Sequence, residues 1–188
     1  FGVNRMSTRL GLTSRALCVI LSFCVAEAAG SRVLYITTSA GYRHDSLETS
    51  AAVLKSIGDR TGLYNLVHTE DLSVISADSL KQFDAVLFFT SGELPLDDTQ
   101  RAALIGYVRN GGNFGGFHSA TDTLYSWSDY GDLIGAYFDG HPWTQQARVL
   151  KTIDHPITAG LPSPWTLTEE YYQFRLISPF QTLLSLDT

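Results

Sequence analysis

The stretch RVLYITT, residues 32–38, decides the fold class of this 188-residue chain. It is a continuous run of apolar and β-branched residues, which is typical of a strand buried on both faces of a parallel sheet. Two further strand-like runs follow, DAVLFFT at 84–90 and NFGGFH at 113–118. Helical patterns separate the runs, so the sequence predicts an α/β protein with a doubly wound, mostly parallel sheet.

The helices of this sheet have recognisable boundaries. Apolar residues at helical spacing predict an amphipathic helix over 47–59. Asp97 and Gln100 have the spacing of a capping box and open a helix that ends near Arg109. The remaining expected elements are a strand over 63–69, a short helix over 77–82, a helix over 130–137, and strands over 146–151, 166–174 and 181–186.

The N-terminal segment has the pattern of a secretory signal peptide. Two arginines precede an apolar run over 16–26, and Ala26 and Ala28 place small residues at a cleavage site. We therefore expect a signal peptide over 1–28, with residues 1–5 as an upstream extension, and one exported domain over 29–188, periplasmic or extracellular. The apolar run is shorter than the roughly 20 residues of a spanning helix, so an uncleaved anchor is the weaker alternative.

Cysteine content and charge exclude several classes of protein. The only two cysteines, Cys18 and Cys24, lie inside the expected signal peptide. The mature chain therefore has no disulfide, no thiolate metal ligand and no cysteine nucleophile. The whole chain carries a net charge of −6, and removing residues 1–28, which contribute +2, leaves about −8. An acidic domain without a basic stripe is a poor candidate for binding nucleic acid.

Polar loops follow three of the predicted strands directly. Open parallel sheets bind ligands at the carboxyl ends of their strands, and these ends share one edge of the sheet. We therefore expect the side chains that begin these loops to converge, namely His44, Glu93, His118 and Asp122. The helix that opens at residue 45 or 46 would aim free N–H groups at the same edge, where they favour an anion or a sugar hydroxyl.

His118, at the expected carboxyl end of its strand, has three interpretations. It can be a general acid or base, a metal ligand, or a hydrogen-bonded buried histidine, and for a lone histidine the last is the commonest. Gly115 and Gly116 indicate close packing, either beneath a sharp turn or against a crossing helix. Tight metal-ligand spacing such as H-x-x-x-H is absent. The Gly-x-Ser-x-Gly elbow of serine hydrolases is absent around Ser119.

Several motifs in order resemble the ThuA-like (trehalose utilisation) family of the class I glutamine amidotransferase-like superfamily. They are GYRHDS at 41–46, GGNFGGFHSATD at 111–122, GAYF at 135–138, DHP at 154–156, GLP at 160–162 and EYYQF at 170–174. The resemblance implies a flavodoxin-like fold. Amidotransferases of this superfamily keep a cysteine at the elbow after the strand that leads here to His118, so amidotransferase activity is expected to be absent.

The chain departs from the family pattern in a few places. Ser119 stands where alanine is usual, and Tyr171 and Gln173 stand where tryptophan and asparagine are expected. The family normally continues with a further strand and helix beyond the position of residue 188. We therefore expect the ThuA-like domain to be truncated at its C-terminus.

The resemblance implies bacterial sugar utilisation, with a disaccharide or keto-sugar as substrate and a hydrolase or a lyase/isomerase as the class of enzyme. We expect His118, Asp122 and His44 to be catalytic, and His118 and His141 to be candidate ligands of a divalent metal ion. The expected substrate-binding residues are Tyr42, Arg43, Glu93, Thr121, Trp143, Glu170 and Tyr172.

A non-catalytic carbohydrate-binding or partner-docking module is the alternative. Aromatic side chains in and near the same loops favour it, because flat aromatic faces suit sugar stacking. These side chains are Tyr42, Tyr125, Trp127, Trp143, Tyr171 and Tyr172.

Overall fold

A four-stranded parallel sheet organises residues 30–187, the part of the chain that this computed structural model describes. Its strand order is β2-β1-β3-β4, formed by β1 (Ser31–Ile36), β2 (Tyr64–Thr69), β3 (Ala85–Phe88) and β4 (Asn113–Gly116). This is the flavodoxin-like order, in which the connections reverse direction between β1 and β3. The predicted α/β fold is thus confirmed, whereas the expected signal peptide lies outside the described residues.

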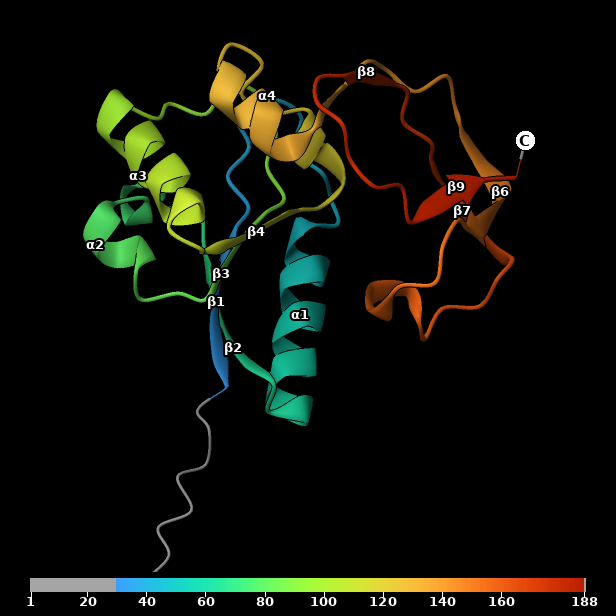
Figure 1. Cartoon of the computed structure of the whole chain (residues 1–188), viewed down its shortest axis with the longest axis horizontal. Coiled ribbons are helices and arrows are strands. Elements are labelled where there is room, and N and C mark those ends of the chain that lie inside the picture. The colour runs from blue at the N-terminus through green and yellow to red at the C-terminus, as the bar shows by residue number, and fades with distance from the viewer. Residues whose placement is uncertain (1–29, 188) are drawn as a thin grey trace, which may run out of the picture.

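Helices cover both faces of the sheet (Figure 1). Helix α1 (Leu47–Thr61) lies on one face, and α2 (Ala77–Leu80) and α3 (Asp98–Arg109) lie on the other. A fourth helix, α4 (Ser128–Ile134), lies near the carboxyl end of the strands. None of these helices, nor any other between residues 30 and 187, is long and apolar enough to cross a membrane.

The core has two parts because side chains alternate across a strand. Leu34 and Ile36 of β1 join the larger cluster, on the face of the sheet that α2, α3 and α4 cover. Tyr35, between them, joins a smaller cluster with Leu47 and Ala51 of α1. All three β1 side chains have no exposed surface, so this strand is buried on both faces, as its unbroken apolar sequence predicts.

The local boundary signals are largely confirmed. The Asp97 side chain accepts a hydrogen bond from the Gln100 N–H, and the Gln100 side chain accepts one from the Asp97 N–H, which completes the predicted capping box of α3. Helix α1 runs two residues beyond the predicted end at residue 59. It stops at Gly62, whose φ of 68° is a left-handed conformation that suits glycine.

Two small antiparallel sheets make up the C-terminal part of the described chain. One pairs β5 (Ala136–Phe138) with β8 (Phe174–Leu176). The other has the order β7-β6-β9, formed by β6 (Thr144–Lys151), β7 (Trp165–Glu170) and β9 (Leu184–Leu186). Figure 1 shows β6, β7, β8 and β9 on the α1 side of the parallel sheet, away from α2 and α3.

Two expectations in this region were wrong. The helix predicted over 130–137 ends at Ile134, because Gly135 takes a left-handed conformation and its N–H closes the last turn on the Gly131 carbonyl. The single strand predicted over 166–174 is two strands in different sheets, β7 and β8. Hydrogen bonds between the backbones of Gln173 and the 139–140 turn start the pairing of β8 with β5.

His118 is not the end of a strand, which corrects the expectation of a strand over 113–118. Strand β4 ends at Gly116, and His118 begins the short 3-10 helix η2 (His118–Thr121) with a φ of 44°. A Cβ on Gly116 would lie 2.7 Å from the Ala120 Cβ and 2.8 Å from the Ile134 Cδ1. The sequence left two reasons for a glycine here, a sharp turn or a crossing helix. Both apply, because Gly116 lies close to the turn at Ala120 and to Ile134 of α4.

We expect Tyr130→Phe to lower the free energy of unfolding by about 1–2 kcal/mol, because a buried acceptor loses its donor. Tyr130 has no exposed surface, and its hydroxyl donates to the Ala120 carbonyl at 2.7 Å. Tyr107→Phe is the matched control, since the Tyr107 hydroxyl donates to the Phe83 carbonyl at 3.1 Å from a partly buried position. Urea denaturation of both variants measures the difference, and equal losses would contradict the role of burial.

Candidate functional site

Three loops meet at the carboxyl edge of the parallel sheet. The loop after β1 is tied to the loop after β3, because the N–H groups of Ala40 and Gly41 both donate to the Ser91 carbonyl. The loop after β3 is tied in turn to the segment after β4, because the Gly92 N–H donates to the Asp122 carbonyl at 2.7 Å. The sheet edge therefore holds the polar segments together, as the parallel topology predicts.

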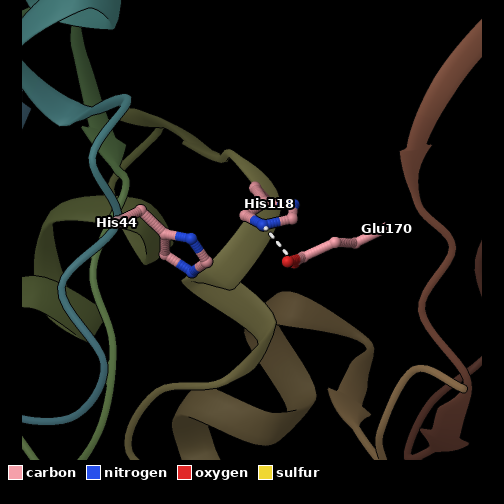
Figure 2. Close-up of side chains that lie close together, drawn as sticks. All are labelled: His44, His118 and Glu170. Carbon is pink, nitrogen blue, oxygen red and sulfur yellow. Dashed lines mark ion pairs between the residues drawn. The ribbon is translucent and has the colours of Figure 1, made fainter. Parts of the chain in front are cut away.

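His118 lies at the centre of the polar groups at this edge. Its Nε2 is 2.8 Å from the Tyr172 hydroxyl and 3.2 Å from Oε2 of Glu170. Figure 2 shows the glutamate reaching toward His118 from the C-terminal part of the chain. The side chains of His118 and Glu170 are 23% and 28% exposed. The site thus forms between the sheet edge and the residues at and just after the end of β7, and solvent reaches it.

His44 faces His118 from the loop before α1 (Figure 2). The two ring centroids are 4.6 Å apart and the rings meet edge to face. Burial lowers the pKa of His44, and the charge of His118 lowers it further, while nearby carboxylates act in the opposite direction. His44 is therefore a neutral imidazole at neutral pH, with one ring nitrogen free to accept a hydrogen bond or to bind a metal ion.

Carboxylates dominate the charge of the site. Glu170, Asp122 and Glu169 all act to raise the pKa of His44. Burial raises the pKa of the Tyr172 hydroxyl, and the same three carboxylates raise it further. Tyr172 therefore stays protonated at neutral pH and can donate a hydrogen bond. A centre with this charge favours cations and neutral ligands over anions such as sugar phosphates.

Aromatic rings border the polar groups. The Tyr172 ring lies 4.2 Å from the ring of Phe138, centroid to centroid, and stacks on His141 at 5.9 Å. His118 also packs edge-on against Phe89 at 5.8 Å. Phe89 and Phe138 were not among the expected site residues. Each lies in or next to a strand, and nothing in its spacing separates it from core residues.

His118 and His141 were the expected metal ligands, but the structure brings a different set of possible ligands together. His44, His118 and Glu170 each offer a ligand atom, and these atoms all lie within 4.8 Å of one another. His141 lies beside this group at Glu170, where its Nε2 is 3.9 Å from the glutamate Oε2. His141 is therefore a neighbour of this cluster of three.

Three other expected site residues lie near His118 with partners of their own. Asp122 accepts a hydrogen bond from the Tyr125 hydroxyl at 2.7 Å. Thr121 donates from its hydroxyl to the His118 carbonyl at 3.1 Å and so supports the turn. Tyr42 is 68% exposed and lies edge-on to the His44 ring at 4.9 Å.

The structure does not bring the remaining expected residues to His118. The Arg43 guanidinium pairs with Glu70 at 2.7 Å and with Glu48 at 3.3 Å. Glu93 accepts hydrogen bonds from the N–H and the hydroxyl of Ser126, so it anchors one loop to another. Trp143 is 56% exposed and lies in the turn after β5.

One cavity among residues 30–187 lies away from this site. This cavity, of about 480 Å³, lies at the opposite edge of the sheet. It is lined by Asp84 just before β3, by Asn113 at the start of β4 and by Tyr107 of α3. It contains none of the histidines. The centre at His118 is instead an open, partly exposed group of side chains at the edge of the sheet that binds ligands in this architecture.

The fold and the site together define a class of protein. The sheet is flavodoxin-like, the turn after β4 carries a histidine with a positive φ, and residues 30–187 contain no cysteine. These features define a flavodoxin-like domain with a histidine-centred site at the carboxyl edge of its parallel sheet. The chain belongs to the ThuA family, described as trehalose utilisation, whose model matches residues 32–188.

A solved structure supports the same fold. The crystal structure of a protein described as ThuA-like, from Bacteroides uniformis, superposes with a TM-score of 0.73 at 24% sequence identity. The match covers 86% of this chain and 70% of that chain. No protein of curated function matches this chain significantly in sequence.

Proposed function

We propose that this ThuA-family chain is an exported enzyme domain that acts on a neutral disaccharide or keto-sugar at the His118 centre, without amidotransferase activity. The observation that carries the proposal is the position of His118 Nε2, held between the Tyr172 hydroxyl at 2.8 Å and the Glu170 carboxylate at 3.2 Å. An imidazole in contact with both an acid and a base, and reachable from solvent, is typical of a reaction centre.

His118 can serve such a reaction in two ways. Its Nε2 can move a proton to or from a sugar oxygen, with Glu170 and Tyr172 in contact with the same nitrogen. Alternatively, the same nitrogen can hold a metal ion that polarises a sugar carbonyl. Both roles depend on Nε2, so both make His118 the essential residue of the site.

The surroundings suit an uncharged sugar. Tyr172 and His141 stack with their ring planes 19° apart, and Tyr42 lies exposed beside His44. Flat faces of this kind pack against sugar rings, while the carboxylates of Glu170, Asp122 and Glu169 disfavour a phosphorylated substrate. Export belongs to the same proposal, supported by the signal-peptide pattern of residues 1–28.

Calorimetry and product analysis on the mature chain test the function. Neutral disaccharides and their keto derivatives are titrated into the protein, and NMR follows each mixture with and without added divalent metals. We expect binding and turnover of at least one of them. Binding without product under every metal condition would favour the carbohydrate-binding module instead, and failure to bind any sugar would overturn both functions.

A further inference from the structure

We propose that His44, His118 and Glu170 bind a divalent transition-metal ion. They come from three separate segments: the loop before α1, the turn after β4 and the end of β7. Their ligand atoms already lie within 4.8 Å of one another. Two imidazoles and one carboxylate form a ligand set that suits zinc and other ions of its class.

The distances between the ligands fit an ion. Two ligands on one tetrahedral zinc ion, with bonds of about 2.1 Å, are roughly 3.4 Å apart. His118 Nε2 and Glu170 Oε2 are 3.2 Å apart, so this pair already has the required separation. All three ligand atoms lie within 4.8 Å of one another, so side-chain movements of about 1–1.5 Å bring the whole set to the separation that an ion requires.

The charges around the three side chains favour a cation. Asp122 and Glu169 add two carboxylates close to His44, beyond Glu170 itself. The hydrogen bond between Asp122 and Tyr125 holds the first of these in place at 2.7 Å. A bound ion offsets the repulsion among the carboxylates and shields the two adjacent imidazoles from each other.

Three protein ligands leave a coordination position open. Structural zinc sites are closed by four protein ligands, whereas catalytic sites keep one position for water or substrate. The Tyr172 hydroxyl, 2.8 Å from His118 Nε2, would lie next to a ligand of such an ion. The site is partly exposed to solvent, so a sugar oxygen can reach the open position.

Metal titration of the mature protein, first stripped with a chelator, tests the inference without any sugar. Calorimetry with zinc chloride is expected to show one ion per chain. We expect His44→Asn and Glu170→Gln to weaken binding by at least about 100-fold, since even the loss of a residue behind a ligand weakens binding about 10–100-fold. His155→Asn is the matched control. It removes an imidazole elsewhere and keeps an acceptor for the Ile157 N–H, which His155 Nδ1 accepts now.

X-ray absorption of the zinc-loaded unmodified protein is the second measurement, and it does not depend on whether a variant folds. It is expected to show a shell of two imidazoles with oxygen ligands. Absence of stoichiometric zinc binding, or equal binding by His44→Asn, Glu170→Gln and the unmodified chain, would overturn the inference. Sugar turnover by the fully stripped protein would show that the reaction at His118 needs no metal ion. That result would overturn a catalytic role for the ion and leave the proposed function standing, because turnover and metal binding are measured separately.

Discussion

His118→Asn is expected to lower kcat/KM for the sugar substrate by at least about 100-fold, the lower end of what a positioned proton-transfer group contributes. Asparagine lacks an imidazole nitrogen at the Nε2 position, which faces Tyr172 and Glu170. It tolerates the left-handed backbone well, and His118 has a φ of 44°. The expected result is therefore loss of turnover with nearly unchanged stability.

The choice of replacement matters, because alanine at a positive φ adds backbone strain and would mix a folding defect with a chemical one. Steady-state kinetics and urea denaturation are measured on the same preparations. His155→Asn is the control, since His155 lies in the turn that starts the short helix at Pro156–Thr158. Retention of full turnover by His118→Asn would refute the central role of this histidine, whether as a proton-transfer group or as a ligand.

Gly92→Ala is expected to lower the free energy of unfolding by about 3 kcal/mol or more, through strain combined with a backbone collision. Gly92 has a φ of 75°, and a Cβ there would lie against the Gly41 nitrogen and 2.7 Å from the Ala40 carbonyl carbon. Neither backbone atom can rotate away as a side chain could. The loop that carries His44 would have to separate from the loop after β3.

Gly106→Ala is the matched control for this substitution. Gly106 lies inside α3, and a Cβ there would meet nothing within 4 Å. We expect it to raise stability by up to about 1 kcal/mol, because alanine favours a helix more than glycine does. Urea denaturation of both variants measures the contrast. A loss below about 1 kcal/mol for Gly92→Ala would show that the loops tolerate a side chain between them.

The parallel strands and the start of α3 could be predicted because their causes are local. An unbroken apolar run is buried wherever it folds, and Asp97 caps its helix through a residue three positions away. The end of β4 was wrong by two residues because its cause is tertiary. The Phe117 N–H still donates to the Phe88 carbonyl, but the next residue turns into η2, which no property of the local sequence reveals.

The candidate site shows the same division. The polar loops at the strand ends were expected to converge, and His44 and His118 do meet. Glu93 was expected with them, but it binds Ser126, which lies 33 residues away in the chain. An acidic side chain in a loop has many reachable partners, and only the folded backbone selects one.

The sequence by itself determined a parallel α/β sheet with polar loops at one edge and no thiol among residues 30–187, because strand burial, capping and composition are properties of short segments. Only the tertiary structure decided that Glu170 and Tyr172 turn toward His118. They lie more than 50 residues along the chain from it. Strand β7 and the turn after it set the direction of these side chains, and that direction depends on contacts across the whole domain.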